Sequence, residues 1–278
     1  MLKVGVIGMG FVGGSMHESF FLKGMEKDVN LFGYDKFKDG GIGCLDNMFE
    51  CDIIFTALPT KYNNELGQYD KQSTIDTCQI LSDNGFSGVI VIKSTVEPET
   101  TNRLSEQFPN LQFIHNPEFL TARTAFEDFH NQTHIVLGKG PTCSDNNYYN
   151  VKHFYSTYYP DAGISECTCL ESESMKSFVN CFYSVKVQFF TELYLLCQKN
   201  GCDYETVKNM MLRNDWINPM HTTIPGPDGQ VSYGGLCFPK DTNALNKYMI
   251  REGTPNKVLA ATIEERNEMR DDHDNCDN

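Results

Sequence analysis

The stretch "KVGVIGMGFVGGSM", residues 3–16, joins a short apolar strand to a glycine turn and then to the start of a helix. Gly8, Gly10 and Gly13 fit the pattern G-x-G-x-x-G. In such a turn the first glycine permits the tight bend and the second lets a pyrophosphate approach the backbone, while the third lets helix and strand pack closely. The stretch therefore predicts the first strand–turn–helix unit of a dinucleotide-binding fold.

A second strand-like run, "VNLFGYD", ends at Asp35, which lies 22 positions after Gly13 (35 − 13). An acidic side chain at this point accepts hydrogen bonds from a ribose 2′-hydroxyl and repels a 2′-phosphate. The sequence therefore favours NAD over NADP as the cofactor. The alternative is a glycine-rich turn that binds no ligand.

More strand-like runs follow, separated by polar helix-like segments, and this alternation predicts a parallel sheet covered by helices. The runs are "DIIFTAL" (52–58), "GVIVIKST" (88–95), "LQFIHN" (111–116) and "THIVLG" (133–138). Three of them end in "LPT", "KST" and "NPEFL". Because ligands bind beyond the carboxyl ends of parallel strands, we expect these three turns to converge on one rim of the sheet.

From about residue 169 the pattern becomes helical. Residues 170–201 contain no proline and no internal glycine, and their apolar side chains recur at steps of three and four, which predicts one long helix. Further helices are expected at 203–213, 241–251 and 256–269. The predicted fold class is α/β: a Rossmann-type parallel-sheet domain (1–168), a helical central domain with a long connecting helix (169–270), and an acidic tail (271–278).

Two polar groups in the helical half are candidates for catalysis. Lys176 and Asn180 are four residues apart on the long helix, so both can donate hydrogen bonds to a developing oxyanion, although spacing alone favours a solvated helix face. Cys237 stands in "GGLCFPKD", after a long loop rich in Gly, Pro and Asn. Lys240 and Asp241 can steer its ionisation, whereas the alternative is a buried structural cysteine in a tight turn.

Composition limits the partners and the compartment. A formal charge of −14 without a Lys/Arg cluster argues against binding nucleic acid or an acidic membrane. No apolar run approaches the ~18 residues of a membrane span. The chain starts directly with a strand, so we expect no signal peptide, and eleven cysteines then indicate reduced thiols in the cytoplasm. No C-x-x-C pair or histidine group is present, and we expect no metal site.

These pieces, in this order, resemble the UDP-glucose/GDP-mannose dehydrogenase family. The resemblance covers residues 3 to about 270 and rests on "GVIGMGFVG", "LPT", "KSTVEPETT", "NPEFL", "ESMKSFVN" and "SYGGLCFPKD". It implies an NAD-binding Rossmann domain and a homodimer built on the long central helix. It also implies that the enzyme oxidises the 6-hydroxyl of a nucleotide sugar twice, to a carboxylate, with UDP-glucose to UDP-glucuronate as the leading reaction.

The resemblance assigns a role to each matching residue. Cys237 is implied to be the nucleophile, Lys176 and Asn180 the oxyanion donors, and Asp241 the group that organises water; Glu118 is implied in water activation or acyl chemistry and Thr95 in proton transfer. The positions implied to bind NAD are Gly8, Gly10, Phe11, Val12, Gly13, Asp35, Pro59, Thr60, Thr95 and Lys240. Those implied to bind the UDP-sugar are Glu118, Phe119, Leu120, Lys176, Asn180, Tyr233 and Gly234.

Three departures from the family and two alternatives remain. Thr121, Ala122 and Arg123 follow "NPEFL" where the family has Arg-Glu-Gly or a similar acidic variant, and the stretch between Asp35 and Asp52 is unusually short. The chain stops where the third domain of the family, which helps to hold the UDP, is expected to begin, so we expect weaker binding of the substrate. A two-domain β-hydroxyacid dehydrogenase would match the length, but it performs one hydride transfer and needs no cysteine. A catalytically silent nucleotide-binding module is the second alternative.

Overall fold

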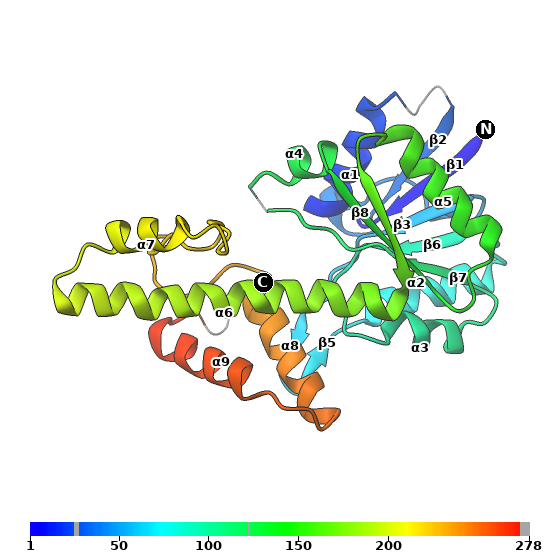
Figure 1. The fold of residues 1–278 in the computed structure, drawn as a ribbon. Coiled ribbons are helices and arrows are strands. Elements are labelled where there is room, and N and C mark those ends of the chain that lie inside the picture. The colour runs from blue at the N-terminus through cyan, green and yellow to red at the C-terminus, as the bar shows by residue number, and fades with distance from the viewer. Residues whose placement is uncertain (25–27, 122, 273–278) are drawn as a thin grey trace. The chain divides into compact units, whose positions relative to one another are not determined.

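The computed structural model describes residues 1–24, 28–121 and 123–272 (Figure 1). The chain divides into two compact units, one formed by Met1–Thr60 with Asp70–Lys176 and the other by Lys61–Tyr69 with the chain from Ser177 onward. Most of the acidic tail lies outside the described residues. The limits 1–168 and 169–270 stay a prediction for the domains, since the two units divide inside the long helix.

The first unit is built on a sheet in the order β2-β1-β3-β6-β7-β8-β9. Parallel pairs join β2, β1, β3, β6 and β7, whereas β8 runs antiparallel to β7 and parallel to β9. The expected strands all form, and the α/β class is confirmed with a mostly parallel sheet. The strands are β1 (Leu2–Ile7), β2 (Val29–Tyr34), β3 (Ile53–Thr56), β6 (Val89–Ile92), β7 (Gln112–His115), β8 (His134–Lys139) and β9 (Gly163–Thr168).

Helices cover both faces of this sheet (Figure 1). On β3, Phe55 packs on one face with α1 (Phe11–Leu22), α4 (Ala125–His130) and α5 (Asp145–Tyr158), whereas Ile54 packs on the other with α2 (Gln72–Asp83) and α3 (Thr100–Gln107). Burial on both faces explains why the strands read as continuous apolar runs. β9 was not expected, because this edge strand is largely exposed and polar.

The second unit is helical, as expected from the sequence. The long helix α6 (Cys169–Asn200) is unbroken and contributes its part from Ser177 onward. Apolar clusters join that part to α7 (Tyr204–Leu212) on one side, and to α8 (Phe238–Arg251) and α9 (Lys257–Met269) on another (Figure 1). Among the described helices, none combines the length and the hydropathy of a transmembrane span.

Helix α8 begins at Phe238, three residues earlier than expected. Proline is well tolerated in the first turn of a helix, and Pro239 occupies that turn here. The earlier start places Cys237 at the N-cap position of α8 instead of inside a preceding loop.

A small hairpin, β4 (Tyr62–Asn63) with β5 (Gln68–Tyr69), also belongs to the second unit. It follows β3 in the chain, yet Tyr62 and Tyr69 pack with Ala244 of α8. No sequence pattern predicted this hairpin, because strands of two residues are too short for a periodic pattern.

Candidate active site

The glycine turn after β1 has the shape that a dinucleotide requires. Gly8 has a φ of 89°, and a Cβ on it would lie 2.5 Å from the carbonyl oxygen of Ala57. A Cβ on Gly13 would lie 1.8 Å from the carbonyl oxygen of Gly8, so helix and strand pack closely there. A Cβ on Gly10, by contrast, would meet no described atom within 4 Å. Open space beside the first amides of α1, the turn that carries Phe11 and Val12, suits a pyrophosphate.

Asp35 lies at the end of β2 with both carboxylate oxygens occupied by backbone amides. Oδ2 accepts from Met9 N at 2.8 Å, and Oδ1 accepts from the amides of Phe37 and Lys38 at 2.9 Å each. Partial burial alone raises the pKa of Asp35, but these hydrogen bonds and the Lys38 charge outweigh it and hold the pKa below its usual value. The carboxylate is therefore ionised and tied to the glycine turn, and it retains acceptor capacity for a ribose hydroxyl. These residues fit NAD.

Two of the three turns predicted at the rim are joined in the structure. Thr60 Oγ1 donates to the carbonyl oxygen of Thr95 at 2.8 Å, and Ser94 Oγ donates to that of Leu58 at 2.7 Å. Thr60 and Thr95 are buried, whereas Pro59, directly before Thr60, is exposed. The ends of β3 and β6 thus form one polar edge.

The third turn, after β7, is contacted by Lys176 of α6. The Lys176 ammonium donates to the carbonyl oxygen of Glu118 at 2.5 Å and lies 3.5 Å from its Oε1. The same ammonium stands over the ring of Phe119, 5.1 Å from its centroid. Glu118 Oε2 accepts from the Leu120 amide at 2.6 Å. Lys176 is 4% exposed, so the structure brings one buried cation onto Glu118 and Phe119, two of the residues predicted to bind the UDP-sugar.

Behind this turn lies a buried lysine that the sequence analysis did not single out. Lys93 Nζ donates to Asn116 Oδ1 at 2.8 Å, and the same oxygen accepts from the hydroxyl of Tyr155 at 2.5 Å. Burial lowers the pKa of Lys93 to about 7, with the Glu118 charge raising it and that of Lys176 lowering it. A lysine at the end of the apolar run "VIVIK" was the available signal.

His115, on β7 beside Lys93, is also buried, and burial with the Lys93 charge lowers its pKa to about 3. Its Nδ1 lies 2.8 Å from Ser172 Oγ. The imidazole is therefore neutral at every ordinary pH, and the positive charges around Glu118 come from the two lysines.

In the second unit, Asp241 is the centre of a buried polar cluster. Its Oδ1 accepts from Lys240 Nζ at 2.6 Å and from the Tyr69 hydroxyl at 2.5 Å, and its Oδ2 accepts from Asn180 Nδ2 at 2.6 Å. Burial alone raises the pKa of Asp241. The charge and hydrogen bond of Lys240, together with the hydrogen bonds from Tyr69 and Asn180, outweigh burial and hold the pKa below its usual value. Asp241 is therefore a carboxylate with a fixed orientation. Tyr69, which lies on the unexpected hairpin, was missed from the sequence.

Cys237 differs from the buried cysteines in its exposure to solvent. Burial raises the pKa of Cys51, Cys78 and Cys169 to about 12, which keeps those thiols protonated and inert. Cys237 is only half-buried and lies at the N-terminus of α8, where the partial positive charge of the helix favours a negative group. None of the cysteines in the described parts of the chain forms a disulfide.

The loop before Cys237 is held by two arginines, Arg266 in α9 and Arg270 directly after it. Arg266 Nε donates to the carbonyl oxygen of Tyr233 at 3.2 Å. Arg270 Nη1 donates to that of Val231 at 3.2 Å, and its Nη2 pairs with Asp228 at 2.6 Å. Tyr233 is buried, and Gly234 leaves no room for a side chain beside Arg270.

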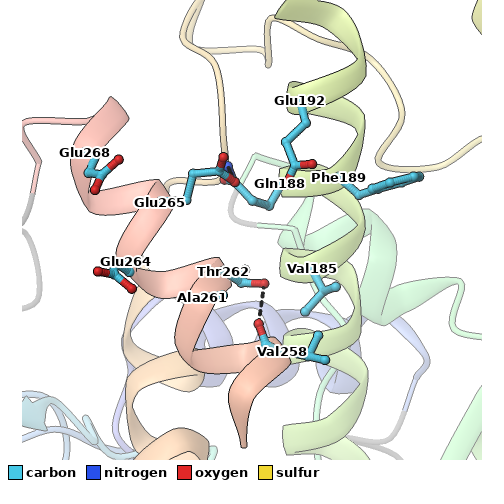
Figure 2. A pocket seen from close by; sticks show the side chains of 10 residues that line it. All are labelled: Val185, Gln188, Phe189, Glu192, Val258, Ala261, Thr262, Glu264, Glu265 and Glu268. Carbon is cyan, nitrogen blue, oxygen red and sulfur yellow. Dashed lines mark hydrogen bonds between the residues drawn. The ribbon is translucent and has the colours of Figure 1, made fainter. Parts of the chain in front are cut away.

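A hollow of about 500 Å³ between α6 and α9 lies apart from these clusters (Figure 2). Gln188 Nε2 donates to Glu265 Oε2 at 2.6 Å, and the pKa of Glu192 is raised by burial and then by its hydrogen bond with Glu265. None of the predicted site residues lines it. Its lining is Val185, Gln188, Phe189, Glu192, Val258, Ala261, Thr262, Glu264, Glu265 and Glu268.

No group of three or more His, Cys, Asp or Glu side chains in the described residues is arranged to hold a metal ion. The clusters above consist of hydrogen-bond donors, ionised carboxylates and one accessible thiol. Such groups can bind a dinucleotide, stabilise an oxyanion and supply a nucleophile.

Family models and curated relatives agree on one family. The NAD binding domain of the UDP-glucose/GDP-mannose dehydrogenase family matches residues 43–158, and its central domain matches residues 170–268. The UDP-glucose 6-dehydrogenase of Campylobacter jejuni is 25% identical over 303 residues, which cover 97% of this chain and 72% of that protein. That of Rhizobium meliloti is 29% identical over 220 residues, covering 76% and 49%. The chain thus spans about half the length of some curated relatives. The matched NAD binding domain confirms NAD as the cofactor.

Solved structures share the fold. A UDP-glucose dehydrogenase from Pyrobaculum islandicum gives a TM-score of 0.80 at 22% identity, covering 96% of this chain and 68% of that chain. A 3-hydroxyisobutyrate dehydrogenase from Mycobacterium tuberculosis gives 0.74 at 13% identity, covering 98% and 95%. Because a hydroxyacid dehydrogenase has the same fold, the fold alone does not choose between the two enzyme classes.

Proposed function

Because this chain belongs to the UDP-glucose/GDP-mannose dehydrogenase family, we propose that it oxidises the 6-hydroxyl of a UDP-sugar to a carboxylate in two NAD-dependent steps. UDP-glucose is the first substrate to test, because the curated relatives are named UDP-glucose 6-dehydrogenases. The observation that carries the proposal is the position of Cys237, at the N-terminus of the helix that also holds the ionised Asp241.

In the first oxidation a hydride leaves C6 of the sugar and a proton leaves its hydroxyl, which gives an aldehyde. The Cys237 thiolate then adds to the aldehyde carbon, and loss of a second hydride from this thiohemiacetal gives a thioester. Water hydrolyses the thioester to a carboxylate and returns the thiol. Bound NAD⁺ supplies the hydride acceptor for each oxidation. The balance is one alcohol, two NAD⁺ and one water giving one carboxylate, two NADH and three protons.

The polar residues of the site stabilise the oxyanion, transfer protons and bind the cofactor. Lys176 and Asn180 lie four residues apart on α6 and donate to the oxygen that gains negative charge. Asp241 orients the Asn180 amide and accepts a proton of the hydrolytic water, while Glu118 and Thr95 take the proton-handling roles implied by the family. The turn at Gly10 and the Asp35 carboxylate hold the cofactor, and Lys240 contributes to its binding.

A homodimer and a cytoplasmic location complete the proposal. Phe182, Phe189 and Leu196 follow one another at steps of seven on α6, and each is more than half exposed, at 64%, 52% and 53%. Such a stripe on a long helix is typical of a helix–helix interface. The accessible thiol of Cys237 requires a reducing compartment to stay active.

The decisive experiment counts the NADH released per UDP-glucose consumed. Wild type should release two and yield a uronic acid. Cys237→Ala should lose the second oxidation, because no thioester can form, while Cys202→Ala, an exposed cysteine of the same unit, should behave as wild type. One NADH per turnover, unchanged in Cys237→Ala, would favour a β-hydroxyacid dehydrogenase. No turnover with any of a panel of nucleotide sugars, despite NAD binding, would favour a silent nucleotide-binding module.

A further inference from the structure

We propose that Tyr69, on the hairpin β4–β5, is a positioning residue whose hydroxyl fixes the Asp241 carboxylate and, through it, the Asn180 amide. The inference rests on the proposed function, in which Asn180 donates to the oxyanion and Asp241 organises water. Nothing in the sequence motifs points to residue 69, since it lies between two of them, "LPT" and "KSTVEPETT".

Tyr69 contacts both members of an ion pair in which the carboxylate is buried and the lysine is partly exposed. Its hydroxyl donates to Asp241 Oδ1 at 2.5 Å, and the Lys240 ammonium, which donates to the same oxygen at 2.6 Å, stands 4.7 Å from the centroid of the Tyr69 ring. Tyr69 is 2% exposed and Asp241 is fully buried. One side chain therefore completes the coordination of Oδ1 and also faces the cation that neutralises it.

With Oδ1 occupied, Asp241 presents Oδ2 to Asn180. Asn180 Nδ2 donates to Oδ2 at 2.6 Å, and an amide held in this way cannot exchange its oxygen for its nitrogen without placing an acceptor against a carboxylate. The second N–H of Asn180 therefore keeps one orientation. A donor that is oriented before the reaction is what stabilises an oxyanion without reorganisation.

Packing holds Tyr69 in place independently of its hydroxyl. The ring packs with Tyr62 and Ala244, and the hairpin turn at Gly67 lies against the aliphatic part of Lys247, 3.4 Å from a Cβ built on that glycine. Replacing the hydroxyl by hydrogen therefore leaves the hairpin on α8. Tyr69→Phe isolates the hydrogen bond from the packing.

The titratable groups that face Asp241 come from three elements: Tyr69 from β5, Lys240 from α8 and Cys181 from α6, whose Sγ donates to the Asp241 carbonyl oxygen at 3.4 Å. Burial raises the pKa of Asp241, but the Lys240 charge and then hydrogen bonds from Lys240, Tyr69 and Asn180 hold it below its usual value. Loss of the Tyr69 donor must raise that pKa. The carboxylate of Tyr69→Phe then becomes protonated at a higher pH than that of wild type.

The kinetic test compares wild type, Tyr69→Phe and Tyr159→Phe across pH in the UDP-glucose assay. Tyr159 is a matched control, because its buried hydroxyl lies 2.8 Å from Ser19 Oγ in the first unit and its removal also breaks one buried hydrogen bond. For Tyr69→Phe we expect kcat to fall by about tenfold, the scale of one hydrogen bond to a charged group. The KM for NAD should stay unchanged, and the acidic limb of the kcat profile should move to higher pH. Tyr159→Phe should leave the profile in place.

A second measurement does not depend on turnover. The carboxyl ¹³C resonance of Asp241, assigned by its loss in Asp241→Asn, should titrate at higher pH in Tyr69→Phe than in wild type. 3-Fluorotyrosine at position 69 is a stronger donor and should not move it upward. Failure of wild type to release two NADH would overturn the proposed function and leave this titration as the test of the Tyr69 hydrogen bond. An Asp241 titration and a pH profile that are the same in Tyr69→Phe and wild type would overturn the inference itself.

Discussion

The guanidinium of Arg270 occupies the space beside Gly234, where a Cβ built on the glycine would lie 2.3 Å from Nη2. The next residue, Gly235, has a φ of 80° and open space around its Cβ position. Glycine is thus required at the two positions for different reasons: Gly234 leaves space for Arg270, the residue that follows α9, and Gly235 takes a left-handed backbone conformation.

This contact predicts the effect of Gly234→Ala. The added methyl group must displace Arg270 and break its hydrogen bonds to the Val231 carbonyl oxygen and to Asp228. The free energy of unfolding should therefore fall by about 1–3 kcal/mol. The KM for the sugar nucleotide should rise as the loop loosens. Gly163→Ala is the control, because its Cβ would meet only the Thr133 carbonyl at 3.8 Å. Equal stability of the two variants in urea would show that Arg270 yields without cost.

Cofactor choice should follow Asp35. Its ionised carboxylate is held at the glycine turn by backbone amides and repels a 2′-phosphate, so NADH should bind more tightly than NADPH. Fluorescence titration of both reduced cofactors measures the preference. Equal affinity would remove Asp35 from the ribose site.

The apolar stripe on α6 predicts the oligomeric state. Phe182→Glu combined with Phe189→Glu should convert a dimer to a monomer, because two carboxylates per chain would be buried at the helix interface. Light scattering at micromolar concentration gives the mass. Phe37→Glu, at an 80% exposed phenylalanine of the first unit, should leave the mass unchanged. A wild-type protein that is already monomeric would contradict the proposal.

Lys93 should make stability depend on pH. The native pKa is about 7 and the unfolded value 10.5, so between these limits the unfolded chain binds one more proton and the free energy of unfolding rises with pH. The slope from this group is at most about 1.4 kcal/mol per pH unit. Burial therefore costs stability below pH 7, and this cost disappears as the pH rises. Lys93→Met should accordingly flatten the rise in urea midpoint between pH 6 and pH 9. Lys36→Met, an exposed lysine, should run parallel to wild type.

Most strands and the glycine turn of the nucleotide-binding half could be predicted from the sequence. Burial on both faces of the sheet requires continuous apolar strands, and close packing at the turn requires glycine. Gly8 and Gly13 have no room for a side chain, and the buried strands are apolar throughout. Lys176 and Asp241 were predicted as site residues from their motifs, and the structure places each in a buried polar cluster, while their catalytic roles stay predictions.

What the sequence did not reveal depends on contacts between distant residues. Tyr69 meets Asp241 across 172 positions, and the hairpin that carries it has strands of only two residues. Lys93 reads as the polar end of a strand until the structure shows it enclosed by Asn116 and Phe129. β9 pairs with β8 while exposing polar side chains, so neither its composition nor its alternation indicated a strand.

Because α6 is an unbroken helix, it determines the spacing between Lys176 and Asn180 along the helix axis. Lys176 and Asn180 are about one turn apart on a helix without internal glycine or proline, and four residues of helix correspond to about 6 Å of axial rise. Substitutions between the two residues that preserve the helix keep that spacing. A single inserted residue would instead rotate Asn180 by about 100° and turn its amide from Asp241 toward a different side of the helix. The number of residues between Lys176 and Asn180 therefore matters more to the orientation of the Asn180 amide than the identity of the residues between them.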